Sequence, residues 1–450
     1  MELKNKFARV IGIGKSGISA ARLLNYFGAR VTLLEQKPRE LVAALADDLE
    51  KLGVTVKAGG YGPKDFEKVD LVVLSPGVNE QEPVYQELMK KGIEVIGEME
   101  LAARFISAPI LAVSGTDGKT TTVSLLGEIF RNQYRDQVWV GGNIGNPLSD
   151  LVLTGKKTEA VILEVSSFQL VQSRTFHPAI AVMLNLAPDH FDRHRGFQDY
   201  YQAKLRLFMN QNQNDAAVLN SEDARVAGMA GKIKSKLLWF GEEIDAREGA
   251  RLLGKEIIYQ NHTRKFTLSV LNWKPLGRHN LENLLAAAAA AGCFGIPPEA
   301  IQAGLDRFHT PGHRIEFITE SRGVKYFDDS KGTTPHAVSA AIRSFSRPVI
   351  LLLGGRNKGI DFSGLADQIK SKVKTVICFG ESRCEIKEQL AGKSIRGVLA
   401  EKMEDAVMLA RDLARPGEVV LLSPGCASFD EFKDYMERGD KFQELVRSFQ

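Results

Sequence analysis

The segment GTDGKTT at residues 115–121 has the residue types of a loop that binds the phosphates of ATP. Its glycines let the backbone approach a phosphate, Lys119 can reach the outer phosphates, and the hydroxyl of Thr120 can bind Mg²⁺. The apolar run ILAVS precedes the segment and the helical pattern TVSLLGEIF follows it, as a phosphate loop requires. Val113 stands where the general GxxxxGK[ST] pattern has its first glycine. We therefore predict a variant P-loop.

Other polar side chains follow apolar runs in the same part of the chain. Glu164 ends the run AVILE, where a carboxylate can hold magnesium beside the loop, although a glutamate at a strand end can equally cap a helix. Asp189 and His190 follow the run AIAVMLNLAP, again where ligands converge, although a lone histidine there is more often structural. A helical pattern with two asparagines spaced to share one face adds His279, Asn280 and Asn283.

Three later segments, FDDSKGTTP, LLLGGRNKG and LLSPGCASFDEF, each join a strand to small, polar or basic residues. Asp329 can hold a ribose hydroxyl, and Lys331 and Lys358 can receive an anionic substrate. Each lysine taken singly is more often a solvated surface residue. Their shared position after strands favours a binding role.

A second glycine-rich loop, VIGIGKSG at residues 10–17, lies between a strand pattern and a helix pattern near the start of the chain. Its first glycine allows a tight turn, its second lets the backbone approach a phosphate, and the helix N-terminus offers unpaired N–H groups. This chemistry is specific for phosphate but not for a dinucleotide. A dehydrogenase has no use for the loop at residues 115–121, so hydride transfer is not indicated.

Parallel sheets are the scaffold that would place these residues together. Continuous apolar runs alternate with helical segments, which is typical of parallel sheets covered on both faces. The runs are ARVIGIG, RVTLLE, DLVVLSPG, ILAVSG, AVILEVSS, AIAVMLNL, PVILLLGG, TVICFG and EVVLLSPG. They form three groups, with breaks near residues 97–104 and 308–314. We predict an α/β chain with three domains, at residues 1–97, 98–308 and 309–450.

The composition is that of an ordinary globular protein, and no nucleic-acid partner is indicated, because 59 basic and 55 acidic residues give a net charge of only +4. The cysteines, Cys293, Cys378, Cys384 and Cys426, lack metal-binding spacing and predict reduced thiols. No secretory signal is recognisable at the N-terminus, and the most apolar run, LLAAAAAA, is too short to span a membrane and predicts a buried helix. We expect a cytoplasmic protein without membrane insertion.

Taken together, the motifs resemble those of the ATP-dependent Mur ligases of bacterial cell-wall synthesis over essentially the whole chain. The motifs, in the family's order, are GTDGKTT, EVSSFQL, NLAPDHFDRH, HNLEN, GHRIE, DDSKGTTP and LLSPGCASFDEF. The resemblance implies a Rossmann-like N-terminal domain, a P-loop ATPase-like central domain and a Rossmann-like C-terminal domain. It also implies that ATP activates the carboxylate of UDP-MurNAc-L-Ala as an acyl phosphate, which the amine of D-glutamate then attacks. We expect the chain to be a monomer.

The resemblance further implies a role for individual residues. Lys119, His190 and Lys204 would be catalytic, with Lys204 carbamylated by CO₂, and two Mg²⁺ ions would be held by Thr120, Glu164, His190 and Lys204. The ATP contacts would be Gly115, Thr116, Asp117, Gly118, Lys119, Thr120, Thr121, His279, Asn280, Asn283, Arg314 and Asp329. The UDP-substrate contacts would be Gly14, Lys15, Ser16, Glu35, Gln36, Ser75, Pro76, Gly77, Asn143 and Ser166. The D-glutamate contacts would be Asp189, Lys331, Thr333, Lys358, Ser428 and Tyr435.

Some positions depart from the family pattern, and other functions stay open. Arg356 replaces an aspartate, DSKGTT replaces DSKATN, and residues 35–37 differ in type from the usual uridine contacts. Without the resemblance, Lys204 would be interpreted as an ordinary lysine on a helix surface. The alternatives are another ligase of the superfamily, such as a folylpolyglutamate synthase, an NAD-linked oxidoreductase, and a nucleotide sensor without catalysis. The N-terminal domain with its SPGV segment argues against a folate ligase.

Overall fold

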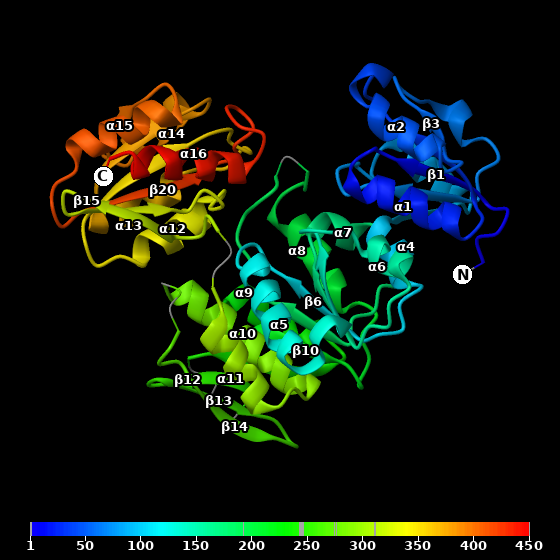
Figure 1. Cartoon of the computed structure of the whole chain (residues 1–450), viewed down its shortest axis with the longest axis horizontal. Coiled ribbons are helices and arrows are strands. Elements are labelled where there is room, and N and C mark those ends of the chain that lie inside the picture. Colours follow the sequence, from blue (N-terminus) through cyan, green and yellow to red (C-terminus); the bar gives the residue numbers. More distant parts are fainter. Residues whose placement is uncertain are drawn as a thin grey trace.

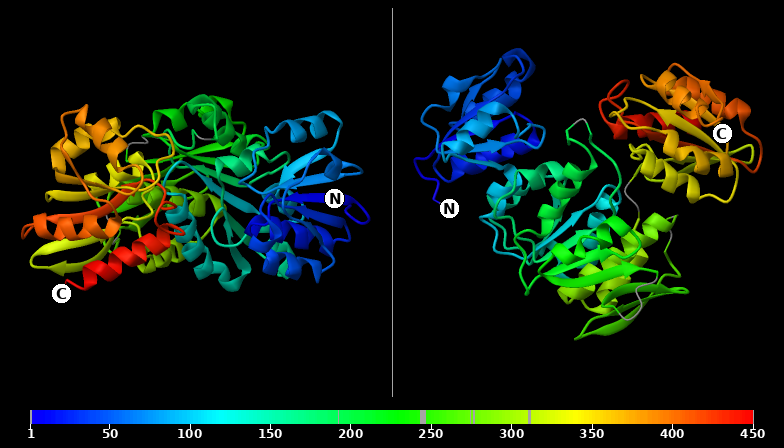
Figure 2. Two further views of the ribbon diagram at one scale, coloured as in Figure 1. Left: turned by 90° about the horizontal axis from the view of Figure 1, so that it is seen from above. Right: turned by 180° about the vertical axis from the view of Figure 1, so that it is seen from behind.

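The computed structural model describes residues 2–191, 193–242, 247–273, 275, 277–309 and 312–449, and it contains three sheets flanked by helices (Figure 1). The sheets follow one another along the chain, so the predicted three-domain α/β fold is confirmed. Figure 2 shows the outer two domains on the same side of the central one, apart from each other. Thr310 and Pro311, within the second predicted break, lie outside the described residues.

The N-terminal sheet is entirely parallel, with the strand order β3-β2-β1-β4-β5. Apolar residues alternate between its two faces and pack in separate clusters, so helices must cover both faces. The strands are β1 (Phe7–Ile11), β2 (Arg30–Leu34), β3 (Thr55–Lys57), β4 (Leu71–Leu74) and β5 (Glu94–Gly97). The helices are α1 (Lys15–Tyr26), α2 (Ala43–Glu50), α3 (Pro83–Lys90) and α4 (Glu98–Ala103), with single turns η1 (Arg39–Leu41) and η2 (Pro63–Phe66).

The central sheet has nine strands in the order β14-β13-β12-β11-β10-β9-β6-β8-β7. They are β6 (Ile110–Ser114), β7 (Val138–Gly142), β8 (Ala160–Glu164), β9 (Ile180–Met183), β10 (Ala216–Asn220), β11 (Lys236–Gly241), β12 (Gly249–Leu253), β13 (Glu256–Gln260) and β14 (Lys265–Ser269). The strands from β6 to β12 pair in parallel, whereas β13 and β14 extend the edge as antiparallel hairpins. These hairpins were not predicted from the sequence, because their segments are short and mix polar with apolar residues.

The central sheet separates two hydrophobic cores, each between one face of the sheet and the helices that cover it, and one core continues into the N-terminal domain. The helices are α5 (Lys119–Tyr134), α6 (Leu148–Thr154), α7 (Ser167–Val171), α8 (Phe197–Leu205), α9 (Ala224–Ala227), α10 (Arg278–Phe294) and α11 (Pro298–Arg307), with single turns η3 (Arg135–Gln137), η4 (Arg206–Phe208) and η5 (Ala230–Lys232). The run LLAAAAAA lies inside α10 and is buried, as predicted. Among the described residues, no helix combines the length and apolarity that crossing a membrane requires.

The C-terminal sheet has six strands in the order β15-β16-β20-β17-β18-β19, and only the β15–β16 pair is antiparallel. The strands are β15 (Glu316–Ser321), β16 (Val324–Asp328), β17 (Val349–Gly354), β18 (Val373–Phe379), β19 (Gly397–Leu399) and β20 (Val419–Gly425). The helices are α12 (Pro335–Arg343), α13 (Ala366–Lys372), α14 (Arg383–Ala391), α15 (Met403–Leu413) and α16 (Tyr435–Arg447), with the single turn η6 (Ser363–Leu365). Separate cores cover the two faces of this sheet.

A buried carboxylate ties α4 to the loop that follows α7. Glu100 accepts hydrogen bonds from the backbone N–H groups of residues 174–176, at 2.9–3.1 Å, and from the guanidinium of Arg104. Burial raises the pKa of Glu100, but the bonds from Thr175, Arg174 and Arg104 outweigh it and hold the pKa below its usual value. The charged carboxylate therefore stabilises the contact between the two segments.

Replacing Glu100 by alanine is expected to destabilise the chain by roughly 3 kcal/mol, because it leaves several buried donors without an acceptor. Since the folded-state pKa is lowered, this stabilisation is present above the unfolded-state pKa and is lost as the pH falls through the folded-state value. Urea unfolding of wild type and Glu100→Ala at pH 7.5 and at acidic pH measures both effects. Glu94→Ala is the matched control, since Glu94 binds the same Arg104 but is 41% exposed; an equal loss in both variants would contradict the prediction.

Candidate active site

Most of the predicted chemistry lies at one edge of the central sheet. Strand β6 pairs in parallel with both β8 and β9, so the carboxyl ends of the three strands meet there. The P-loop follows β6, Glu164 ends β8, and the segment with Asp189 and His190 follows β9. Parallel pairing therefore brings together residues that are far apart in the sequence.

At Gly118, the P-loop has a backbone conformation that only glycine adopts readily. Gly118 has φ +82°, and a Cβ at this position would lie 2.2 Å from Oδ1 of Asn283. The Lys119 Nζ donates to the carbonyl oxygens of Gly115 and Thr116, at 2.9 and 2.7 Å. The Lys119 side chain thus folds back over the P-loop, and its ammonium group lies where a phosphate-binding cation is expected.

Oxygen atoms that suit Mg²⁺ lie beside the P-loop. The Thr120 hydroxyl donates to Oε2 of Glu164 at 2.8 Å, and the Asn143 amide donates to Oε1 at 2.9 Å. A hydroxyl and a carboxylate in contact form the hard-oxygen donor set that Mg²⁺ prefers. Lys331, from the C-terminal domain, donates to the Thr120 hydroxyl at 3.1 Å. The predicted pair of metal ligands therefore lies where the two domains meet.

Lys204 is not on the surface, and the interpretation from its local sequence alone is wrong. Its side chain is 2% exposed on α8, and its Nζ donates to Oγ of Ser114 at 3.1 Å and to the carbonyl of Gly115 at 2.8 Å. Burial, and then the nearby charge of Lys119, lower the pKa of Lys204 well below its usual value. Both hydrogen-bond partners are neutral oxygens, so this amine lies beside the P-loop with its charged form disfavoured.

His190 and Asp189 form a second cluster at the same edge. The backbone N–H of His190 donates to Asp189 Oδ1 at 2.8 Å, and its Nε2 lies 3.3 Å from Oδ2. Burial lowers the pKa of His190 to about 4, and the charges of Lys358, Lys119 and Lys204 reinforce this against the opposing effect of Asp189. The neutral imidazole that results is the form able to bind a metal ion. Lys358 approaches from the C-terminal domain, with Nζ 4.0 Å from Asp189.

A cleft of about 820 Å³ extends from the P-loop between the central and C-terminal domains. Its lining includes the predicted nucleotide contacts Asp117, Gly118, His279, Asn280, Asn283, Arg314 and Asp329. Within the described part of the chain, Asn283 Nδ2 and Arg314 Nε are buried without a hydrogen-bond partner. Burial lowers the pKa of His279 to about 4 and raises that of Asp329 to about 7. A cleft of this size with buried donors suits a nucleotide.

Apart from Asp189, which follows β9 of the central sheet, the predicted D-glutamate residues belong to the C-terminal domain. The Nζ of Lys331 lies 4.9 Å from the centre of the Tyr435 ring, and burial together with Arg314 lowers the pKa of Lys331 to about 7. Ser428 is buried in the segment between β20 and α16, and Thr333 follows Lys331. Arg356 instead forms an exposed ion pair with Glu381, at 2.8 Å.

The predicted UDP-substrate residues of the N-terminal domain form a separate group after β1, β2 and β4. Gly14 is the N-cap of α1, with Lys15 and Ser16 in its first turn, and Ser75, Pro76 and Gly77 follow β4. The Glu35 carboxylate accepts hydrogen bonds from the backbone N–H groups of Ile13 and Lys37, whereas Gln36 is exposed. Glu35 therefore fixes the glycine loop itself. Ser166 is the N-cap of α7 and exchanges hydrogen bonds with Gln169.

Central-domain side chains hold the 75–78 loop of the N-terminal domain. Gln172 donates to the carbonyls of Ser75 and Val78, and Arg193 donates to those of Gly77 and Val78. Neither residue was predicted from the sequence. Asn185 was not predicted either, although its side chain accepts a hydrogen bond from the Asp117 backbone N–H and donates one to the Asp117 carbonyl. The position of Asn185 directly after an apolar run was the available signal.

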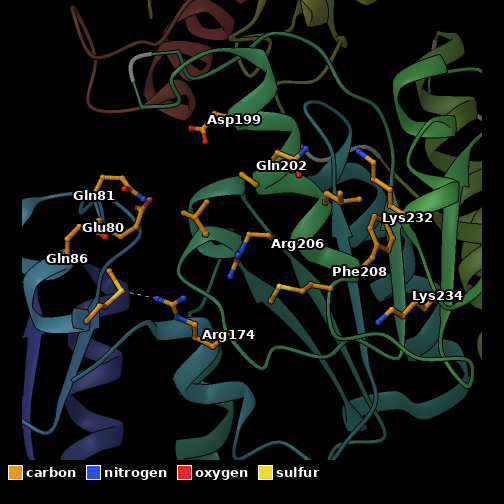
Figure 3. A pocket seen from close by; sticks show the side chains of 15 residues that line it. Glu80, Gln81, Gln86, Arg174, Asp199, Gln202, Arg206, Phe208, Lys232 and Lys234 are labelled. Atoms are coloured by element: carbon orange, nitrogen blue, oxygen red, sulfur yellow. Dashed lines mark hydrogen bonds between the residues drawn. The ribbon is translucent and has the colours of Figure 1, made fainter. Parts of the chain in front are cut away.

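A further cavity, of about 690 Å³, lies between α3 and the α7–α8 region (Figure 3). It contains none of the predicted site residues. Two of its guanidinium groups are held by the protein itself: Arg206 donates to the carbonyls of Leu170 and Ser173, and Arg174 to the sulfur of Met89. The chemistry therefore concentrates in the cleft at the P-loop.

Three family models match successive parts of the chain. They are the Mur ligase MurD-like N-terminal domain at residues 6–97, the Mur ligase middle domain at residues 113–291, and the Mur ligase glutamate ligase domain at residues 313–426. These matches and the site define a three-domain ligase, and the chain belongs to the Mur ligase family.

Curated relatives match over the full length. UDP-N-acetylmuramoylalanine--D-glutamate ligase of Pelotomaculum thermopropionicum is 41% identical, covering 99% of this chain and 98% of the relative. The protein of the same name from Trichlorobacter lovleyi is 39% identical, covering 99% and 100%. Among solved structures, UDP-N-acetylmuramate-alanine ligase from Thermotoga maritima has a TM-score of 0.60 at 19% identity, covering 99% and 100%. The last likeness supports the fold alone.

Proposed function

We propose that this chain is an ATP-dependent ligase that joins D-glutamate to UDP-MurNAc-L-Ala in peptidoglycan precursor synthesis. The observation that carries the proposal is its similarity, over its full length, to relatives that are named UDP-N-acetylmuramoylalanine--D-glutamate ligase. The cleft beside the P-loop, with cations from two domains around it, is the site where the reaction would take place.

The reaction brings two anions together, because the substrate carboxylate must attack the γ-phosphate of ATP. An acyl phosphate forms with loss of ADP, and the amine of D-glutamate then displaces phosphate to give the amide. Lys119, Lys331 and Lys358, which contact Gly115, Thr120 and Asp189 respectively, would in their charged forms reduce the repulsion between the reactants. The buried donors of Asn283 and Arg314 would hold the nucleotide in the cleft.

Thr120 and Glu164 would hold one Mg²⁺ ion, and His190 with a carbamylated Lys204 would hold a second. Bound Mg²⁺ would neutralise phosphate charge and align the displacement. The buried, uncharged amine that the environment of Lys204 favours is the form that reacts with CO₂. Carbamylation would convert a group that repels a cation into a carboxylate ligand. The other predicted contacts with ATP, the UDP substrate and D-glutamate would have the roles that the resemblance to the family implies.

We also propose that residues 1–97 bind the uridine nucleotide, residues 98–308 bind ATP, and residues 309–450 bind D-glutamate. The chain would act as a monomer, because the predicted contacts for all three substrates lie within one chain. Its place would be the cytoplasm, where peptidoglycan precursors would be made. Sedimentation analysis at working concentration tests the monomeric state.

Phosphate release from ATP is the assay that tests the function. It should require UDP-MurNAc-L-Ala and be highest with D-glutamate among candidate amino acids. Preference for another amino acid or for a folate would indicate a different ligase of the superfamily. ATP binding without substrate-stimulated turnover would indicate a sensor, and a change in nicotinamide absorbance without ATP consumption an oxidoreductase.

Lys358→Ala is expected to raise the KM for D-glutamate by roughly tenfold, because a charged hydrogen bond to an anionic substrate is lost. The KM for the uridine substrate should change far less. Steady-state kinetics with each substrate varied in turn measure the difference. An equal rise in both constants would instead show a general defect.

Arg356→Ala is the matched control for Lys358→Ala. Arg356 comes two residues earlier in the same loop, but it is half exposed and paired with Glu381. Exposed ion pairs contribute little, so both KM values should stay within about twofold of wild type. A large loss would show that this chain uses Arg356 directly.

A further inference from the structure

His336 of the C-terminal domain contacts the P-loop, although the chemistry above gives it no role. Its Nδ1 lies 2.7 Å from Oδ2 of Asp117 in the central domain. Thr334 Oγ1 lies 3.3 Å from Oδ1 of the same carboxylate. Both domains therefore meet at one P-loop side chain, 219 residues away from His336 in the sequence.

The N-terminus of α12 provides an electrostatic environment that favours an anion. Thr334 is the N-cap of this nine-residue helix, and its hydroxyl accepts the backbone N–H of Ala337. His336 lies in the first helical turn, where the helix dipole favours negative charge. The Asp117 carboxylate occupies this position, so the ion pair and the helix end stabilise the same contact between domains.

Asp117 places a negative charge on the loop that is proposed to bind phosphate. Its carboxylate lines the cleft proposed for ATP, and a carboxylate near a triphosphate repels it. Although burial opposes it, the hydrogen bond and charge of His336 hold the pKa of Asp117 at about 2, so the group is ionised. The hydrogen bond with Asp117 raises the pKa of His336, which favours the protonated imidazole that would offset this charge.

Other charged groups also lie near the pair. Lys119 and Arg314 also face Asp117, but the Nζ of Lys119 is bound to the carbonyls of Gly115 and Thr116. Arg343 and Asp223 face His336 with opposite signs. The direct contact of His336 is therefore the feature that links domain position to P-loop charge.

We propose that His336 is a positioning residue for ATP binding: by pairing with Asp117, it holds the C-terminal domain against the P-loop and offsets the carboxylate beside the triphosphate. This inference rests on the proposed function, since it assigns the cleft to ATP. It explains why an acidic P-loop residue and a histidine of another domain occur in contact.

The first test is a double-variant cycle with ATP affinity measured by titration calorimetry in low salt. His336→Ala should weaken ATP binding by about tenfold, because Asp117 keeps its charge without the cation. The double variant His336→Ala/Asp117→Asn should bind ATP more tightly than His336→Ala alone, since the repelling charge is gone. Loss of a merely structural histidine would not be rescued in this way.

The second test measures the domain contact without any nucleotide. Small-angle scattering should give a larger radius of gyration for His336→Ala than for wild type. His177→Ala is the matched control, because His177 pairs with Asp215 at the similar distance of 2.6 Å but within the central domain. This control should leave both the radius and the ATP affinity unchanged.

The outcomes separate the two levels of the proposal. Wild type that fails to bind ATP would contradict the proposed function, while the scattering comparison would still test the contact. Wild type that binds ATP, with His336→Ala of equal affinity or with no recovery in the double variant, would overturn the role of His336. An unchanged radius of gyration in His336→Ala would overturn the role in holding the domains.

Discussion

Lys204→Ala is expected to lose activity by at least about 100-fold, because it would remove the proposed carbamate ligand of the second metal ion. The structure places the Lys204 Nζ beside Ser114 and Gly115 at the base of the P-loop, with its charged form disfavoured by burial. A lysine on a helix surface would keep its charged form, and its replacement by alanine would not be expected to reduce activity. Phosphate release at saturating substrates measures the loss.

Chemical rescue distinguishes a carbamate from an ordinary lysine. Short carboxylic acids should restore part of the activity of Lys204→Ala, because they place a carboxylate in the vacated space. Lys204→Arg keeps a positive charge but cannot become a carboxylate, so it should be as inactive as the alanine variant. Full turnover of Lys204→Arg would contradict the carbamate proposal. So would a failed rescue together with an unmodified lysine in the ligand-bound enzyme.

Lys119→Ala is expected to reduce turnover by about 10³-fold or more, since the γ-phosphate loses the cation that offsets its charge as the carboxylate approaches. The side chain extends from the first residue of α5 over the loop carbonyls of Gly115 and Thr116. The loss should appear mainly in kcat, because the charge contact strengthens in the transition state. Single-turnover phosphate release measures it.

Lys15→Ala is the matched control for Lys119→Ala. Lys15 also begins the helix after a glycine-rich loop, but it lies in the N-terminal domain, far from the P-loop in the sequence. It should affect the KM for the uridine substrate and leave the KM for ATP unchanged. Near-normal turnover of a folded Lys119→Ala variant would refute the P-loop assignment.

The sequence predicted the features that depend on neighbouring residues. A segment of about twenty residues is long enough to contain an apolar run, a glycine turn and the start of a helix. Both glycine-rich loops and the nine apolar strands could therefore be identified from the sequence. The three-domain α/β fold followed from the grouping of those runs and is confirmed. Edge hairpins β12–β14 were missed, because their short segments mix polar and apolar residues.

The tertiary structure alone decided which distant side chains meet. Nothing near Lys204 in the sequence distinguishes it from a surface lysine, and its burial follows from the packing of α8 beside the end of β6. Lys331 reaches Thr120 across 211 residues, and His336 reaches Asp117 across 219. These contacts depend on how two separately built sheets are placed relative to each other. Local patterns carry no information on that placement, because it depends on contacts between residues that are far apart in the sequence.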